Sequence, residues 1–418
     1  MPLSPKLPTA DLSPALLQEI SRVAALPAVR GAFADFLSHE AQLAEWQQQL
    51  AKIPAPPFGE QLRSEWMLER FLELGLEQVR TDEAANVFGI RPATGNRYVA
   101  LSAHIDTVFP AGTPLNVRQQ GSRLYGPGVS DNAAGVVAML GIAAAISRSR
   151  VRHTAPILFV ANVGEEGEGD LRGMRHIFAD RHWLDSIAFN LVLDGAGNDT
   201  IVAEALGSRR FEVIVRGPGG HSWSDFGTPN PIVVLARAIE SFRQTPLPVS
   251  PKTTFNIGVI RGGTSVNSIP ESASMRVDIR STSTAEIERL ERALRLGLET
   301  AVADETKGMS QSAKARALGL SAEIVTIGNR PGGELPPEAR ILQVIRSVDA
   351  YLGNVAQVQR ASTDANIPLS LGREAIAIGG GGTGGGAHTL QEWFDCTGRD
   401  FGLKRILLTL LALTGVSE

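Results

Sequence analysis

The sequence predicts an α/β protein in which a mostly parallel central sheet, covered by helices, is interrupted by an inserted α+β domain. Short apolar runs alternate with longer helical segments up to about residue 208. The pattern then changes to long alternating strands, and the first pattern returns from about Gly328. We therefore expect one domain over residues 1–207 and 328–418, split by a second domain over 208–327.

The elements of the first domain begin with helices. Residues 11–52 carry apolar side chains at helical spacing and end at the proline-rich "IPAPPFGE", which predicts a helical extension over residues 1–52. The stretch "EQLRSEWMLERFLELGL" predicts an amphipathic helix that stops at Gly75. Short strands and one apolar helix of a parallel sheet layer are then expected in "RYVALSAH", "AAGVVAMLGIAAAI", "APILFVANV" and "FNLVLDG".

The inserted domain is predicted from three strands whose residues alternate between apolar and polar, "RRFEVIVRG", "TTFNIGVIRGG" and "SASMRVDIRS". Helices are expected at 229–244 and 284–303. The first pattern returns after about Gly328, where we expect a helix at 337–352, a strand in "EAIAIGG" and a helix at 399–413. These elements complete the domain that the insertion divides.

The amino-acid composition excludes some classes of function. A chain of 418 residues exceeds what one core usually supports, so two domains are expected. Forty Lys and Arg face 44 Asp and Glu, a net charge of −4, and no long block of either sign occurs. A nucleic-acid binder would carry a basic patch, so a small-molecule or peptide partner is expected instead.

Cysteine content and hydropathy indicate a cytoplasmic location. Cys396 is the only cysteine and cannot form an intrachain disulfide, which favours a reducing compartment. The first residues lack the charged and apolar segments of a signal peptide. The longest apolar run, 133–146, is shorter than the roughly 18 residues of a membrane span, so no membrane association is expected.

The segment "LFVANVGEEGEGD", residues 158–170, ends an apolar strand with crowded carboxylates. Like charges repel and must be desolvated together, so a positive group is expected among them. Solvated loop carboxylates are the alternative. Asp194 ends the next strand in the same manner, with a turn aspartate as its alternative reading.

Four further residues could join these carboxylates. His104 and Asp106 in "VALSAHIDTVF" point to one face where a strand ends, the place at which open α/β sheets bind ligands. Asp131 directly precedes an apolar helix, and the alternatives are a helix cap for Asp131 and a solvated or hydrogen-bonded pair for His104 and Asp106. His388 follows the glycine run 379–386 and could equally be a surface residue.

Together these residues predict a site for two divalent cations. Asp131, Glu166 and Asp194 supply three negative charges against four positive ones, and a bridging hydroxide would balance the remainder. Zinc suits this mixture of imidazole and carboxylate, although manganese or cobalt would fit similar sites. Glu165 would then stay unbound and act as general base on the water between the metals.

This set resembles the co-catalytic zinc hydrolases that include peptidase T, carnosinase-type dipeptidases, carboxypeptidase G, aminoacylase and the acetylornithine and succinyl-diaminopimelate deacylases. The resemblance runs in family order from about residue 53 to the C-terminus. It rests on "SAHIDTV", "GPGVSDNAAG", "VGEEGEGD", "LVLDG", "GPGGHSW", "GTSVNSIPESASMRVDIRS" and "GGGGTGGGAHTLQEW". It implies a phosphorylase/hydrolase-like catalytic domain and a ferredoxin-like inserted domain that serves as lid and dimerisation domain.

The resemblance also implies roles for residues. His104, Asp131 and Asp194 would hold one zinc, and Asp131, Glu166 and His388 the other, with Asp131 bridging. Asp106 would orient His104, and Glu165 would be the general base. His221 looks like the histidine that reaches into a partner subunit's active site to polarise the scissile carbonyl, which implies a homodimer. The groups expected to bind substrate are Asn267, Arg280, Gly385, Gly386 and Thr363.

Several of these roles have plain structural alternatives. His221 could be an ordinary loop histidine, Arg280 an exposed strand residue, and the glycine run a flexible loop rather than a cradle of backbone amides. Thr363, in "ASTDAN", is expected in the pocket without an assigned chemical role. The extension 1–52 lies outside the resemblance and receives no function.

Two motif details favour peptide cleavage. The position of Asp194 tends to be Asp in aminopeptidases and dipeptidases of this family and Glu in deacylases and carboxypeptidases, and "SDNAAG" resembles peptidase T-like members. We therefore predict a dizinc exopeptidase acting on short peptides. An N-acyl amino acid deacylase or amidohydrolase with the same site is the closest alternative. A catalytically silent metal-binding regulator is the alternative of another class.

Overall fold

The computed structural model describes residues 13–307 and 319–416, and the chain divides into two compact units. The first unit contains the residues up to Ala205 and those from Gly333 onward, and the second is Leu206–Gly332. These boundaries lie a few residues from the expected 207/208 and 327/328. Residues 1–12 of the expected extension, 308–318 of the expected insertion and 417–418 lie outside the described residues.

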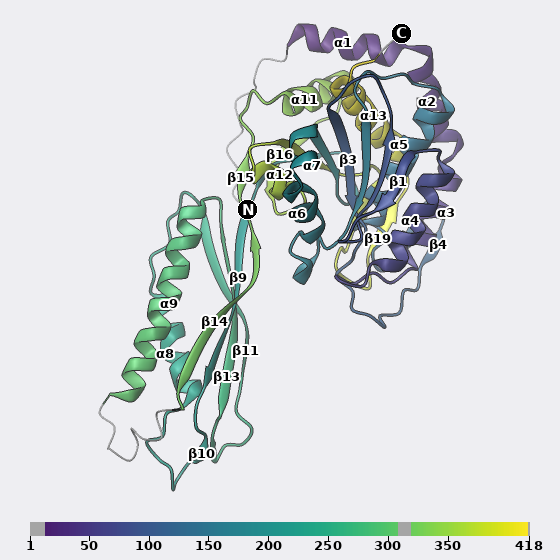
Figure 1. Cartoon of the computed structure of the whole chain (residues 1–418). Coiled ribbons are helices and arrows are strands. Elements are labelled where there is room, and N and C mark those ends of the chain that lie inside the picture. Colours follow the sequence, from purple (N-terminus) through teal and green to yellow (C-terminus); the bar gives the residue numbers. More distant parts are fainter. Residues whose placement is uncertain (1–12, 308–318, 417–418) are drawn as a thin grey trace. The chain divides into compact units, whose positions relative to one another are not determined.

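A nine-stranded mixed sheet forms the centre of the first unit (Figure 1). Its middle strands β6, β3, β7 and β17 are parallel, and antiparallel strands lie toward its edges. In spatial order the strands are β1 (Glu77–Thr81), β2 (Val87–Arg91), β6 (Ile157–Asn162), β3 (Tyr98–His104), β7 (Ile187–Leu193), β17 (Glu374–Ile378), β8 (Thr200–Ala205) and β15 (Gly333–Glu334), with β16 (Gln357–Ala361) paired to β8.

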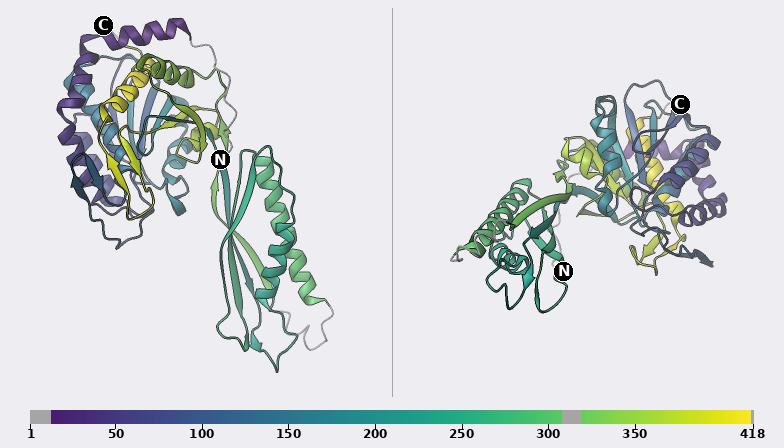
Figure 2. Two further views of the ribbon diagram at one scale, coloured as in Figure 1. Left: turned by 180° about the vertical axis from the view of Figure 1, so that it is seen from behind. Right: turned by 60° about the horizontal axis from the view of Figure 1, so that its bottom comes forward.

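Helices cover both faces of this sheet (Figure 2). On one face are α1 (Pro14–Ala25), α2 (Pro27–Ser38), α3 (Glu40–Ala51), α5 (Ala133–Arg148), α11 (Arg340–Leu352) and α13 (Arg399–Thr414). On the other are α6 (Arg172–Ala179), α7 (Arg181–Ser186) and α12 (Asn366–Ser370), while α4 (Gln61–Glu73) packs on β1 and β2. No helix in the described part of the chain has both the length and the apolar character of a membrane span.

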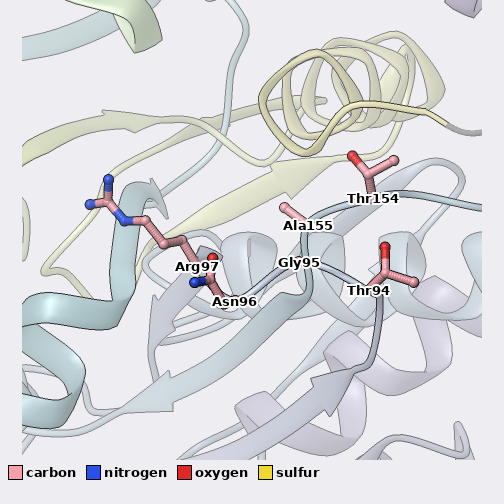
Figure 3. Close-up of a pocket in the computed structure, with 6 residues that line it drawn as sticks. All are labelled: Thr94, Gly95, Asn96, Arg97, Thr154 and Ala155. Atoms are coloured by element: carbon pink, nitrogen blue, oxygen red, sulfur yellow. The ribbon is translucent and has the colours of Figure 1, made fainter.

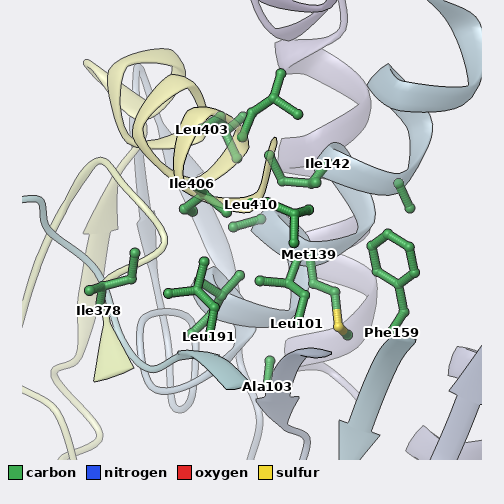
Figure 4. Close-up of a cluster of buried hydrophobic side chains, with 14 of the residues drawn as sticks. Leu101, Ala103, Met139, Ile142, Phe159, Leu191, Ile378, Leu403, Ile406 and Leu410 are labelled. Carbon is green, nitrogen blue, oxygen red and sulfur yellow. The ribbon is translucent and has the colours of Figure 1, made fainter. Parts of the chain in front are cut away.

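The main core lies between the sheet and helices α5 and α13 (Figure 4). Leu101 and Ala103 of β3, Leu191 of β7 and Ile378 of β17 meet Met139, Ile142, Leu403, Ile406 and Leu410 from the two helices. The sheet is buried on both sides, because Ala100, the neighbour of Leu101 on β3, packs in the cluster of the other face. Such two-sided burial explains why the sequences of these strands are continuous apolar runs.

A small antiparallel sheet brings two distant segments together. Its order is β18 (Thr383–Gly385), β19 (Trp393–Asp395), β5 (Arg123–Tyr125) and β4 (Arg118–Gln120). Because β19 pairs with β5, the residues that follow β5 lie beside those that precede β19. The connection after β5 contains Asp131, and the connection before β19 contains His388. The pairing of the two strands therefore brings these two residues close together.

The second unit contains a four-stranded antiparallel sheet with two helices on one face. The chain runs β9 (Gly207–Arg216), α8 (Pro231–Arg243), β11 (Thr253–Gly262), β13 (Ser272–Ser281), α9 (Thr284–Thr306) and β14 (Ser321–Arg330), and the sheet order is β11-β13-β9-β14. This βαββαβ order is ferredoxin-like. A two-stranded ribbon, β10 (Gly220–His221) with β12 (Ser268–Ile269), is also present.

The predicted fold class is confirmed, but several strands had not been predicted. β1, with the sequence EQVRT, is an exposed edge strand, and neither β1 nor the short strands β4, β5 and β18 carry an apolar alternation. Such strands form because a neighbouring strand supplies hydrogen-bond partners, which is not visible in their own sequence. The use of the second unit as a lid or dimerisation domain stays a prediction.

Packing of β3 leads to a stability prediction. Leu101→Ala removes a fully buried side chain from the main core, so the free energy of unfolding is expected to fall by about 2–5 kcal/mol. Leu37→Ala, at a position that is 62% exposed on α2, is the matched control and is expected to change it by less than about 0.5 kcal/mol. Urea unfolding followed by circular dichroism measures both, and equal effects would contradict the described core.

Candidate metal centre

The carboxyl ends of three neighbouring parallel strands place most of the predicted residues at one edge of the sheet. His104, the last residue of β3, is paired in register with Asn162, the last residue of β6. Glu165 and Glu166 follow β6, and Asp194 follows β7. Parallel strands end at the same edge, so residues from distant chain segments meet there.

One group of potential ligands is His104, Asp131 and Asp194, whose ligand atoms all lie within 4.8 Å of one another. His104 Nε2 is 3.3 Å from Asp131 Oδ1 and 3.9 Å from Asp194 Oδ1. The His104 ring is 1% exposed. The strand therefore delivers a buried imidazole nitrogen to a pair of carboxylates.

A second group is Asp131, Glu166 and His388, again with all ligand atoms within 4.8 Å. His388 Nε2 lies 3.0 Å from Asp131 Oδ2 and 2.9 Å from Glu166 Oε1. The two oxygens of Asp131 thus face different histidines, Oδ1 toward His104 and Oδ2 toward His388. This is the arrangement of a carboxylate able to bridge two cations.

Asp106 lies behind this pair of groups and is fully buried. Its carboxylate accepts hydrogen bonds from the backbone N–H groups of Glu165 (3.0 Å) and Glu166 (2.8 Å). One of its oxygens also lies 3.5 Å from His104 Nδ1, the ring nitrogen that faces away from Asp131. Asp106 thereby connects the end of β3 to the two glutamates.

Glu165 is buried and belongs to a third group of potential ligands, with His104 and Glu166. Its carboxylate therefore lies within 4.8 Å of a ring nitrogen of His104 and an oxygen of Glu166. Glu166 also contacts His388, so the two adjacent glutamates both lie at this centre.

Electrostatics show how strongly the centre favours positive charge. Burial opposes the charge on His104, but interactions with the carboxylates of Asp106, Asp131 and Asp194 outweigh it and hold the His104 pKa well above its ordinary value. The hydrogen bond to Asp131 and the charge of Glu166 raise the pKa of His388 to about 9, although partial burial opposes this. Burial and the Asp131 charge raise the pKa of Glu166 to about 7.

The donor set fits divalent cations. Asp131 Oδ1 is buried and accepts no hydrogen bond from the described residues. A buried carboxylate oxygen without a donor is costly, and a metal ion would satisfy it. Two imidazoles and three carboxylates, with one carboxylate shared, match the ligand preferences of zinc and also those of manganese or cobalt.

Asn132, rather than Asp131, is the cap of helix α5, so the capping alternative for Asp131 is wrong. The Asn132 side chain accepts a hydrogen bond from Gly135 N at 3.2 Å. The same side chain donates to the Leu193 carbonyl oxygen (2.9 Å) and accepts from Gly195 N (2.9 Å). It therefore fixes the connection that carries Asp194 as well as the start of the helix.

Two further buried acids lie behind the site: sequence reasoning missed Glu392, and it placed Asp364 in the pocket without a chemical role. Glu392 is fully buried and accepts hydrogen bonds from three backbone N–H groups of the segment that carries Asp131. Asp364 is also fully buried and accepts from Asn162 Nδ2 at 2.6 Å, and burial raises the pKa of Asp364 to about 7. Glu392 lies in a motif that carried the family resemblance, and Asp364 lies in the segment that was expected in the pocket. These two motifs were the sequence signals that could have pointed to both residues.

The predicted residues of the inserted domain lie in the second unit. His221 is exposed, and its Nδ1 accepts hydrogen bonds from the backbone N–H groups of Trp223 (3.2 Å) and Ser224 (3.4 Å). Asn267 lies beside it, because Ser222 N donates to the Asn267 carbonyl oxygen at 2.9 Å. Arg280 forms an ion pair with Asp278 at 2.7 Å on the same strand.

The glycine run is required by close packing. Residues 383–385 form β18, and a Cβ on Gly384 would lie 2.2 Å from Ser130 Oγ. Part of the run is therefore a paired strand rather than a loop. Gly385 is partly exposed and Gly386 exposed, whereas Thr363 is buried and its hydroxyl accepts from Ala365 N. Binding of substrate by these three residues stays a prediction.

A shallow pocket of about 300 Å³ lies at the other end of β3 (Figure 3). It is lined by Thr94, Gly95, Asn96, Arg97, Thr154 and Ala155. These residues precede β3 and β6, so they belong to the opposite edge of the sheet from His104. The pocket contains none of the predicted site residues.

Comparison with known proteins assigns the family. The profile of "Peptidase family M20/M25/M40" matches residues 100–411, about three quarters of the chain. The chain belongs to this family. The resemblance drawn from its motifs is thereby confirmed, and the M20/M25/M40 match covers all five predicted metal ligands.

Individual relatives agree with this assignment. A protein from Ajellomyces dermatitidis named "Probable carboxypeptidase" is 31% identical over 219 residues, which cover 48% of this chain and 49% of that protein. The chain spans about half the length of the curated M20/M25/M40 relatives it matches first.

Two solved structures share the fold. Aminopeptidase PepT from Bacillus cereus has a TM-score of 0.70 and 20% identity, covering 89% of this chain and 98% of that one. The YXEP protein of Bacillus subtilis, described as a dinuclear metal binding peptidase from the M20 family, has a TM-score of 0.64 and 14% identity, covering 91% and 99%.

The raised histidine pKa values predict a pH dependence for the metal-free protein. A group whose pKa is higher in the folded state stabilises it below the unfolded-state pKa, about 6.5 for histidine. For His388 this stabilisation is lost as the pH rises through about 9. Thermal unfolding in a chelator is therefore expected to show a midpoint that falls between pH 6.5 and 9. His388→Gln should flatten this slope, and an unchanged slope would contradict the described contacts.

Proposed function

We propose that the chain is a dizinc metallopeptidase that hydrolyses amide bonds of short peptides, as a di- or tripeptidase or an aminopeptidase. The observation that carries the proposal is the pair of three-residue groups that share Asp131, with Glu165 beside them. The family assignment supports amide hydrolysis. A reducing, cytoplasmic compartment is part of the proposal, since Cys396 has no second cysteine in the sequence with which to pair.

In this proposal His104, Asp131 and Asp194 would hold one zinc, and Asp131, Glu166 and His388 would hold the other. Two bound divalent cations would activate a water molecule at neutral pH and polarise the scissile carbonyl group. Asp106 keeps His104 in orientation through the ring nitrogen that does not face the carboxylates. The same residue fixes the backbone of Glu165 and Glu166, so one buried carboxylate positions members of both groups.

Glu165 is the proposed general base. It accepts a proton from the attacking water and later gives this proton to the leaving amine. The same carboxylate therefore serves first as the base and then as the acid. The third group of ligand atoms, which contains His104, Glu165 and Glu166, puts this carboxylate next to the proposed ligands.

His221 is proposed to polarise the scissile carbonyl in a partner subunit of a homodimer. Its Nδ1 accepts two backbone hydrogen bonds, which leaves the proton of the neutral ring on Nε2. An N–H at that position is the donor that a developing oxyanion requires. Asn267, Arg280, the amides of Gly385 and Gly386, and Thr363 are proposed to contact the rest of the substrate.

Arg280 suits a substrate carboxylate because its guanidinium can donate two parallel hydrogen bonds. Its ion pair with Asp278 leaves it 41% exposed, so the side chain remains accessible. This assignment favours a substrate with a free carboxylate, which short peptides and N-acyl amino acids share. Asp194 favours peptides over N-acyl amino acids by the family tendency described above.

A substrate panel tests the proposal. Purified protein with zinc is incubated with di- and tripeptides and, in parallel, with N-acetyl and N-succinyl amino acids. Release of free amino acids from the peptides is expected. Cleavage of the acylated amino acids alone would replace the peptidase by a deacylase. Two bound zinc ions without turnover of any substrate would identify the catalytically silent regulator.

The role of Glu165 predicts a separation of metal binding from turnover. Glu165→Gln removes the proton acceptor while keeping size and shape, so turnover is expected to fall by at least about 10²–10⁴-fold. Zinc content, measured by elemental analysis, is expected to stay at two ions. His104→Ala and His388→Ala are the contrasting variants and should lose zinc as well as turnover. Wild-type turnover in Glu165→Gln would exclude Glu165 as the base.

A further inference from the structure

The segment between β5 and α5, residues 126–131, carries the residue on which the proposed metal centre depends. Asp131 is common to both groups of ligands, so a shift of its backbone would disturb both. The segment is a series of turns and lies outside the strands of the sheet. Apart from Val129 N, which donates to the Gly126 carbonyl oxygen at 3.4 Å, its N–H groups therefore need acceptors from elsewhere.

Glu392 supplies those acceptors. Its Oε2 accepts from Gly128 N at 2.9 Å, and its Oε1 accepts from Ser130 N and Asp131 N, both at 2.7 Å. The Glu392 backbone carbonyl also accepts from Gly126 N at 2.9 Å. The side chain is 0% exposed. A carboxylate is the only ordinary side chain that can accept all of these bonds without presenting a hydrogen to one of the donors.

The segment is also held from its carbonyl side by the helical extension. Gln47 of α3 is 0% exposed, and its Nε2 donates to the Val129 carbonyl oxygen at 2.5 Å. Gln47 Oε1 accepts from Arg399 Nη2 at 2.6 Å, which fixes the orientation of the amide. Arg399 begins α13 and is 2% exposed. A buried chain of hydrogen bonds thus runs from α13 through α3 to two residues before Asp131.

We propose that Glu392 and Gln47 are positioning residues for the metal centre: together they hold the backbone of residues 126–131 so that both oxygens of Asp131 face the two groups of ligands. This inference rests on the proposed function. It gives the helical extension a role, although the extension lies outside the residues that the family profile matches. Neither residue contacts substrate or metal in this proposal.

The test measures zinc affinity of the full chain. Glu392→Gln keeps one acceptor oxygen but turns an amide N–H₂ toward a backbone donor, and Gln47→Met keeps the side-chain volume but removes both hydrogen bonds. Each variant is expected to bind zinc about 10–100-fold more weakly than the wild type, as measured by competition with a chromophoric chelator. Glu392→Asp, which keeps the carboxylate, is expected to lie between Glu392→Gln and the wild type.

Asp349→Asn is the matched control. Asp349 is a buried carboxylate of α11 that pairs with Arg405 Nε at 2.6 Å and Nη2 at 2.8 Å, and neither residue is a hydrogen-bond partner of residues 126–131 in the described part of the chain. This variant should lower the thermal midpoint of the metal-free protein while leaving zinc affinity unchanged. The comparison separates a general loss of stability, which all variants share, from a loss of metal positioning, which only the Glu392 and Gln47 variants should show.

The outcomes are distinguishable. Wild-type zinc affinity in Glu392→Gln or in Gln47→Met, despite a lowered thermal midpoint, would overturn the positioning role of that residue. If Glu392→Gln does not fold, Glu392→Asp and Gln47→Met carry the test. After zinc saturation, the KM for peptide should match the wild type. A wild-type protein that binds no zinc would instead refute the proposed function itself.

Discussion

Mutual repulsion of carboxylates at the carboxyl edge of the central sheet is the constraint on which the rest of the structure depends. Two like charges about 4 Å apart repel by about 4 kcal/mol even at an effective dielectric constant of 20. Asp131, Glu166 and Asp194 converge there beside two histidines. In the metal-free protein, imidazoles between the carboxylates offset this repulsion, and the pKa of His388 rises to about 9 as a result. Divalent cations would do so more completely, because each carries twice the charge.

Such crowding requires a rigid surround, and the fold supplies it through buried polar residues. Asp106 accepts from the backbone of both glutamates, and Glu392 accepts from the backbone around Asp131. Asn132 connects the start of α5 to the end of β7. In each case a side chain from one segment satisfies main-chain groups of another. The geometry of the centre is thereby tied to the packing of the whole first unit.

The second unit has one apolar and one polar face on its sheet. Its sheet packs α8 and α9 on one face and carries ion pairs such as Arg280 with Asp278 on the other. Its aromatic residues Trp223 and Phe226 are 87% and 90% exposed beside His221. A polar strand face and an exposed loop suit a unit that meets substrate or a partner, as the proposed function requires of it.

Local patterns in the sequence determined the strand-ending residues of the sheet and the alternating strands of the second unit. They do so because burial on one or both faces of a strand imposes a direct periodicity on its side chains. The family motifs added the identities of the potential ligands. Edge strands such as β1, the capping role of Asn132 and the contacts of Glu392 and Gln47 were decided by the tertiary structure. The Gln47 amide lies 82 positions from the carbonyl it contacts, and Glu392 lies 261 positions from Asp131. Nothing in a local pattern specifies which distant backbone group a buried polar side chain will satisfy, because only folding brings donor and acceptor together.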